Sequence, residues 1–199
     1  VQGPGGHSWS DFGVPNPIVV LSRAIARFSR TELPAEPKIS TNVGVISGGT
    51  SVNSIPESAT MRVDIRSASP QEMDRVERAL RDAVAEAASE YPRRGRNGSK
   101  GITYDIQPIG CRPAAELDPN ARILHVIRAV DAHLGNRARP HRASTDANIP
   151  LSLGREAISI GAGGSGGGAH TLQEWYDPAG RDLGLKRVLL AVLALAGVK

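Results

Sequence analysis

Two segments of alternating hydrophobicity constrain the fold of this chain most strongly. Residues 39–45 and residues 59–65 each alternate apolar or β-branched side chains with small or polar ones, as half-buried strands do. The stretch between them, residues 47–56, is a long turn rich in Gly, Ser and Asn. We therefore expect these residues to form a hairpin with a broad loop.

Helix signals lie on both sides of this hairpin. Asn16 followed by Pro17 is typical of an N-cap and first helical residue, and apolar residues then recur every three or four positions to residue 28. Residues 69–72, Ser-Pro-Gln-Glu, form a capping box with proline at the first helical position. Helical spacing then continues to Tyr91.

A further alternating segment at residues 102–106 predicts a strand after the second helix. With a strand ending near Gly3, the order becomes β-α-β-β-α-β, a ferredoxin-like domain that lacks most of its first strand. We place this domain at residues 1–112 and a second part at residues 113–199.

The second part alternates predicted helices and strands, as a doubly wound α/β sheet does. With about two strands it cannot cover both faces of its own sheet, so we expect it to be part of a larger one. The predicted elements are a helix capped by Asp118-Pro119, a basic strand-like segment at 137–143, a short helix at 144–153, a buried strand at 157–160 and a final helix around 185–195.

Composition excludes several classes of partner. The chain has 199 residues, 40% hydrophobic and 22% charged, with a net charge of +4, which is typical of a globular protein. Its apolar runs are shorter than the ~20 residues of a membrane-spanning helix, so we expect no membrane partner. The Arg93–Arg96 cluster lacks interleaved aromatic residues, so we expect no nucleic acid. A single cysteine, Cys111, excludes an intrachain disulfide.

A glycine-rich segment and its following histidine are the strongest local functional signal. Residues 161–166 match G-x-G-x-x-G, but a dinucleotide site also needs a helix directly after the glycines, and His170 and Trp175 follow instead. A nucleotide site is one hypothesis. We favour the interpretation that the glycine backbone amides, which no side chain covers, let a substrate anion approach the backbone closely. His170 is a candidate metal ligand or acid/base, although no His-x-x-x-His or Cys pair accompanies it.

Four motifs, in order along the whole chain, resemble one family. The chain resembles the aminoacylase-like dizinc metallopeptidases, which include glutamate carboxypeptidase, tripeptidase, acetylornithine deacetylase and succinyl-diaminopimelate desuccinylase. The motifs are Gly3-Pro4-Gly5-Gly6-His7-Ser8 with Pro15-Asn16-Pro17-Ile18, Gly48 to Pro56 with Asp64-Ile65-Arg66, Ser144 to Asn148, and the glycine loop with Ala169 to Trp175. The resemblance implies a lid, or dimerisation, domain followed by the C-terminal part of an α/β zinc-peptidase catalytic domain.

The resemblance also implies roles for individual residues. His170 matches the C-terminal zinc ligand, and Glu174 could orient that segment. His7 matches the lid histidine that reaches the partner subunit's active site and stabilises the scissile carbonyl or its oxyanion. Asn53 and Arg66 match substrate-binding lid residues, with Gly163, Gly164 and Gly166 offering backbone amides to the same substrate. For Arg66, an ion pair with Asp64 or Glu57 is the alternative.

The sequence departs from the family at the metal site. The family implies five protein ligands, including a His-x-Asp motif and a Glu-Glu pair, and the sequence contains neither. We therefore expect this chain to be a fragment without the N-terminal half of the catalytic domain, inactive alone and at most weakly metal-bound. The intact homodimer would use two Zn²⁺ ions to hydrolyse a C–N amide bond of a small peptide or N-acyl amino acid. The alternative is a non-catalytic ferredoxin-like dimerisation module.

Overall fold

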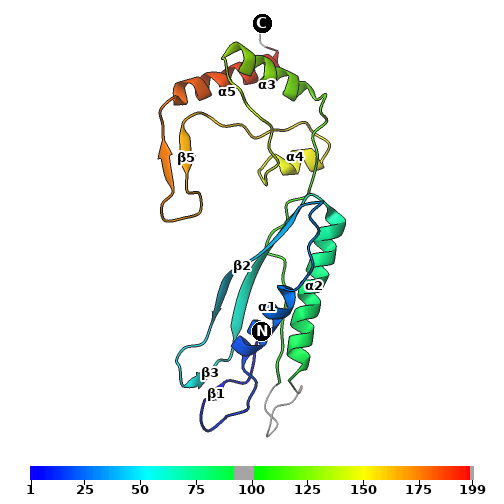
Figure 1. Cartoon of the computed structure of the whole chain (residues 1–199), viewed down its shortest axis with the longest axis vertical. Helices are drawn as coiled ribbons and strands as arrows, with labels where there is room; N and C mark the ends of the chain where they lie inside the picture. The colour runs from blue at the N-terminus through cyan, green and yellow to red at the C-terminus, as the bar shows by residue number, and fades with distance from the viewer. Residues whose placement is uncertain (92–100, 198–199) are drawn as a thin grey trace. The chain divides into compact units, whose positions relative to one another are not determined.

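The computed structural model describes residues 1–91 and 101–197 of the chain (Figure 1). The chain divides into two compact units, Val1–Cys111 and Arg112–Lys199, which are described separately below. The Arg93–Arg96 cluster lies outside the described residues. Of the helices within the described ranges, none combines the length and the apolar character that crossing a membrane requires.

Both helices of the first unit begin at the predicted residues. Helix α1 spans Pro17–Phe28, and Asn16 Oδ1 accepts a hydrogen bond from Ile18 N–H at 2.9 Å. Helix α2 spans Pro70–Ser89, and Ser69 Oγ accepts from the backbone N–H of Glu72 at 3.3 Å. These side chains satisfy N–H groups that have no partner inside the helix, so the N-cap predictions are confirmed. The reciprocal half of the predicted capping box is wrong, because Ser69 N–H donates to Ser67 Oγ at 3.1 Å and the Glu72 carboxylate accepts from Arg75 instead.

The predicted hairpin is confirmed as the centre of this unit. Strand β2 (Ile39–Gly48) pairs antiparallel with strand β4 (Ala59–Ser67), with a register shift between Val43 and Val45. Helices α1 and α2 pack on the face that carries Met61, Val63 and Ile65 (Figure 1). The core between helices and sheet is built from Val20, Ala24, Phe28, Ile39, Val76, Leu80, Ala83, Val84, Ala87 and Ala88.

The fourth predicted strand, residues 102–106, is wrong as a regular strand. Gln2 forms isolated antiparallel bridges to both Ser58 and Thr103, so this part of the chain lies beside Gln2 with a single bridging residue. The neighbour order Thr103, Gln2, β4, β2 is nevertheless that of a ferredoxin-like sheet. The unit therefore has the predicted α+β, ferredoxin-like fold.

A cluster of charged residues joins the end of α2 to α1. The Glu90 carboxylate accepts hydrogen bonds from Arg27 and from Arg23, the latter at 2.5 Å. The Arg23 guanidinium also lies 5.4 Å from the centre of the Tyr91 ring, a cation–π distance. Partial burial works to raise the pKa of Glu90, but the two arginines outweigh it and hold that pKa below its ordinary value.

The second unit contains helices α3 (Arg122–His133), α4 (Asn148–Ser152) and α5 (Arg181–Ala196), with one small hairpin of β5 (Ser165–Gly167) and β6 (Trp175–Asp177). The strands predicted at 137–143 and 157–160 are wrong, because both segments are irregular. Helix α3 begins at Arg122, one turn later than predicted, because Asp118 instead accepts from Asn120 N–H in a preceding turn. These elements alone do not form the expected α/β sheet.

Helices α3 and α5 are joined by an ion pair between the buried Asp131 and the half-buried Arg187. Arg187 donates from Nε to Asp131 Oδ1 at 2.5 Å and from Nη2 to Asp131 Oδ2 at 2.7 Å. Asn136 donates to the same carboxylate at 3.3 Å. Because Asp131 is buried, this bidentate geometry fixes how the two helices meet.

Candidate functional site

The structure brings His7 and Asn53 together at one end of the ferredoxin-like unit. The short strand β1 (Gly6–His7) pairs antiparallel with β3 (Ser54–Ile55), which lies in the long loop of the hairpin. Directly after the paired residues, Ser8 N–H donates to the carbonyl oxygen of Asn53 at 2.9 Å. Two of the predicted lid residues, 46 positions apart in sequence, therefore share one exposed surface.

The glycines before His7 are required by this close approach. Gly5 has a φ of +70°, and a Cβ there would lie 2.5 Å from Glu57 Cγ. Gly6 has a φ of +150°, and a Cβ there would lie 2.9 Å from Asp11 Cβ. Residues other than glycine adopt such φ angles only at an energetic cost. The Gly5-Gly6 dipeptide therefore lets the chain turn tightly against Glu57 and Asp11.

The loop after His7 holds both its backbone and its ring. His7 N–H donates to Asp11 Oδ2 at 2.8 Å, and Trp9 N–H donates to His7 Nδ1 at 3.2 Å. The sequence prediction missed Trp9 and Asp11, although their positions two and four residues after the histidine are the signal that could have identified them. In the hairpin loop directly before β3, Asn53 Oδ1 accepts from the Ser51 hydroxyl at 2.8 Å.

Arg66 lies at the other end of the hairpin. It is paired with Ser40 near the end of β4, seven residues beyond Ala59, which is about 24 Å at 3.4 Å per residue. The structure thus separates Arg66 from His7 and Asn53 within one unit. Its Nε donates to Asp64 Oδ2 at 2.6 Å, so of the two ion pairs considered from sequence, the described contacts contain the one with Asp64.

In the second unit, the glycine-rich segment forms one strand of a hairpin. Gly166 pairs with Tyr176, and the Tyr176 hydroxyl donates to the carbonyl oxygen of Gly163 at 3.1 Å. At Gly164, with a φ of +80°, a Cβ would lie 2.4 Å from the Tyr176 hydroxyl oxygen. Packing against Tyr176 therefore explains the glycines at these positions. A dinucleotide site requires a helix to start directly after the glycines, but here the chain continues through a turn into β6.

His170 and Glu174 lie in the turn between β5 and β6, and both are exposed. His170 has a φ of +65°, and Glu174 N–H donates to the carbonyl oxygen of Thr171 at 3.2 Å. Within residues 1–91 and 101–197, no group of three or more His, Cys, Asp or Glu side chains is arranged to hold a metal ion. His170 fits one position in a metal's ligand set, which other residues would have to complete.

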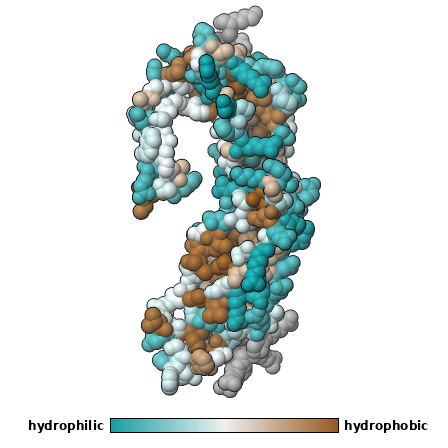
Figure 2. Space-filling model, in the orientation of Figure 1, coloured by the Kyte–Doolittle hydropathy of each residue, from teal (hydrophilic) through white to brown (hydrophobic). Residues whose placement is uncertain are grey.

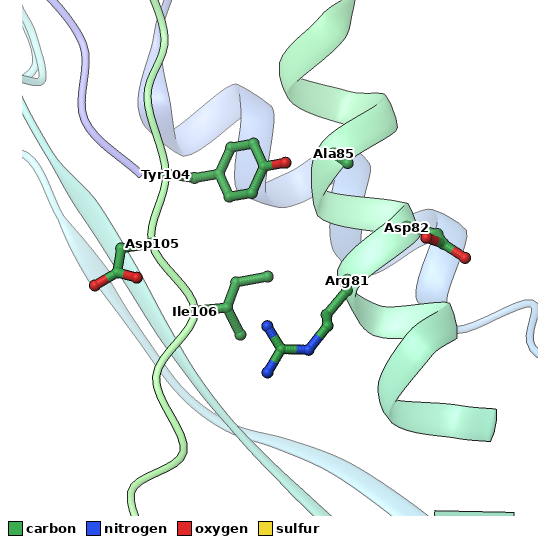
Figure 3. A pocket seen from close by; sticks show the side chains of 6 residues that line it. All are labelled: Arg81, Asp82, Ala85, Tyr104, Asp105 and Ile106. Atoms are coloured by element: carbon green, nitrogen blue, oxygen red, sulfur yellow. The ribbon is translucent and has the colours of Figure 1, made fainter. Parts of the chain in front are cut away.

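A recess of about 420 Å³ in the first unit contains none of the predicted site residues. It lies between α2 and the extended residues 104–106 (Figure 3) and is lined by Arg81, Asp82, Ala85, Tyr104, Asp105 and Ile106. Tyr104 and Ile106 point toward α2, whereas Asp105 points away. Side chains of residues 104–106 therefore alternate in direction as in a strand, but these residues form no regular ladder of backbone hydrogen bonds.

Comparison with known proteins agrees with the fold and with the lid motifs. Residues 1–92 match the family described as the peptidase dimerisation domain, which confirms the resemblance to the aminoacylase-like metallopeptidases. No match was found among curated proteins.

Several solved structures share the fold. A tripeptidase from Staphylococcus aureus has a TM-score of 0.70 at 20% identity, over 98% of this chain and 50% of its own. An aminopeptidase from Bacillus cereus has a TM-score of 0.64 at 17% identity, with the same coverage. An amidase of the hydantoinase/carbamoylase family from Burkholderia vietnamiensis has a TM-score of 0.70 at 20% identity, over 97% of this chain and 45% of its own. The chain thus spans about half the length of these proteins.

Proposed function

We propose that this chain is part of a zinc-dependent amidohydrolase. The premise is the match of residues 1–92 to the family described as the peptidase dimerisation domain. The intact protein would hydrolyse a C–N amide bond of a small peptide or an N-acyl amino acid. This chain would supply the lid and one metal ligand. The observation that carries the proposal is the pairing of His7 with the hairpin loop of Asn53 at one exposed end of the dimerisation domain.

The proposed role of His7 is to stabilise negative charge on the scissile carbonyl oxygen. Attack of water on an amide carbonyl creates an oxyanion, and a donor held in place before the reaction lowers the barrier to it. An exposed imidazole fixed by its own loop suits that task, and the Asn53 amide supplies further N–H donors beside it. Since both groups project from the lid, they would act on a substrate held by a different unit.

Arg66 would bind a substrate carboxylate by a bidentate contact. Because about 24 Å of strand separates it from the His7 end, one lid cannot place both residues on one small substrate. In a homodimer, His7 and Asn53 would serve the active site of the partner, and Arg66 a second active site. The Asp64 carboxylate, 2.6 Å from Arg66 Nε, would orient the guanidinium until substrate arrives.

His170 would be one ligand of the zinc site, with Glu174 orienting its segment and the amides of Gly163, Gly164 and Gly166 contacting substrate. Zinc supplies a water activated for attack at neutral pH when it is bound. The remaining ligands would come from a segment beyond residues 1–199. This agrees with the absence of His-x-Asp and Glu-Glu from the sequence and with the length of the similar structures.

The test is a pair of alanine variants in the intact enzyme. His7→Ala should lower kcat by roughly 10²- to 10³-fold, the cost of removing one oxyanion donor, and leave the zinc content unchanged. His170→Ala should lower the zinc content as well as the activity. His133→Ala, an exposed histidine of α3, is the control and should change neither. Full activity in both variants would instead favour the non-catalytic dimerisation module.

A further inference from the structure

The loop that follows His7 determines which nitrogen of its ring can carry a proton. Trp9 N–H lies 3.2 Å from His7 Nδ1 and is the donor of that pair. A backbone amide nitrogen cannot accept a hydrogen bond, so Nδ1 must offer its lone pair. In the neutral imidazole the proton then belongs to Nε2.

The backbone of His7 is fixed from two directions. Within the loop, His7 N–H donates to Asp11 Oδ2 at 2.8 Å, and Asp11 N–H donates back to the His7 carbonyl at 2.9 Å. From the hairpin, His7 pairs with Ser54, and Ser8 N–H donates to Asn53. The Asp11 turn therefore sets the distance at which Trp9 N–H meets the ring.

We infer that His7 carries its proton on Nε2, with Trp9 N–H bound to Nδ1, and that Asp11 is the residue that positions this arrangement. The inference deepens the proposed function and rests on it for its purpose. A residue that stabilises an oxyanion has to present an N–H group, and with Nδ1 bound to Trp9 N–H the exposed His7 side chain offers Nε2–H. Asp11 acts through His7 and has no contact with substrate in this scheme.

Nuclear magnetic resonance of the 199-residue chain tests the inference without any assay of activity. Two-bond ¹H–¹⁵N correlation spectra at alkaline pH report which ring nitrogen carries the proton. The exposed His125, His133, His141 and His170 are references in the same spectrum. A scalar coupling between Trp9 N and His7 Nδ1 would show the hydrogen bond directly. We expect that coupling and a higher ratio of Nε2–H to Nδ1–H for His7 than for the references.

Two variants of Trp9 separate its amide from its indole. Trp9→Pro removes the N–H donor and should lower the His7 tautomer ratio about threefold to tenfold, the population change that one net hydrogen bond produces. Trp9→Ala keeps the donor and should leave the ratio unchanged. For the positioning role, Asp11→Ala should lower the ratio and Asp11→Asn should restore it, because the amide oxygen can accept His7 N–H in the same place.

Absence of the coupling in the unmodified chain, together with a His7 ratio equal to that of the references, would overturn the inference even if Trp9→Pro fails to fold. An overturned tautomer inference can be told apart from a failure of the proposed function. A tautomer fixed as expected, combined with full activity of His7→Ala in the intact enzyme, would refute the catalytic role alone.

Discussion

One carboxylate from a distant part of the chain holds the N-terminus of α3. Glu156 Oε1 accepts from Arg122 N–H at 3.0 Å, and its Oε2 accepts from Ile123 N–H at 2.9 Å. The first N–H groups of a helix have no partner inside it, and a negative charge there also interacts favourably with the helix dipole. A single side chain thus performs the capping that the sequence assigns to Asp118.

Replacing Glu156 by Ala should therefore destabilise the second unit by about 1–2 kcal/mol, as loss of a helix cap does. Hydrogen exchange of the backbone amides of α3 should accelerate accordingly, because both orphan donors return to solvent. Glu116→Ala is the matched control, since that side chain is 84% exposed and lies 3.7 Å from Arg142. Its effect should stay within about 0.5 kcal/mol. Equal exchange rates for the two variants would contradict the capping role.

At the scale of elements, the sequence predicts structure well where a local pattern also determines its partner. Residues 39–48 and 59–67 pair because one loop joins them, and both helices of the first unit start at a local cap. Residues 102–106 show the same alternation, and residues 157–160 are predicted as a buried strand, but either pattern describes only which faces of the segment are apolar. It does not provide a neighbouring strand with which to form a ladder.

The same limit applies to the candidate site. The Gly-Gly-His and hairpin-loop motifs identify His7 and Asn53, and the structure places them side by side. The distance of Arg66 from them and the packing of Gly164 against Tyr176 depend on tertiary contacts. A spacing in the sequence carries no information on such contacts.

The ion pair between α3 and α5 predicts an acid-sensitive second unit. The Arg187 hydrogen bonds outweigh burial and hold the pKa of Asp131 below its ordinary value, so the folded state binds its proton less readily than the unfolded state. The stabilisation is complete above the unfolded pKa of about 3.9 and is lost as pH falls through the lower folded value. Asp131→Ala should cost about 3 kcal/mol at pH 7, because it leaves the half-buried guanidinium of Arg187 without its carboxylate partner.

Urea unfolding at pH 7 and at pH 3 measures this difference for the chain and for Asp131→Ala. The gap in the free energy of unfolding should narrow at pH 3, because the unfolded chain then binds a proton at Asp131 more readily than the folded chain does. Arg81→Ala, which breaks an exposed pair with Glu77 on α2, should change stability by less than about 1 kcal/mol at either pH. A gap that is constant with pH would show that the carboxylate charge does not stabilise the packing of the helices.

At the scale of the whole molecule, the first unit has a sheet edge that suits association. Strand β2 pairs with β4 on one side and with no other strand among the described residues, and its Val45 and Ile46 side chains are 48% and 52% exposed. Hydrophobic residues reach the surface over this strand in Figure 2. An edge with free backbone groups and apolar side chains favours pairing with another strand. This agrees with the match of residues 1–92 to the family described as the peptidase dimerisation domain.

We therefore expect the 199-residue chain to form a homodimer through β2, which sedimentation equilibrium can measure. Ile46→Lys should raise the dimer dissociation constant at least tenfold, because a charge on an edge strand would be desolvated in the pair. Leu153→Lys, an equivalent change at a position of the second unit that is 72% exposed, should leave the constant unchanged. Circular dichroism would verify that both variants keep their secondary structure. If Ile46→Lys remains as dimeric as the unmodified chain, then β2 is not the contact and another face of the lid must carry the association.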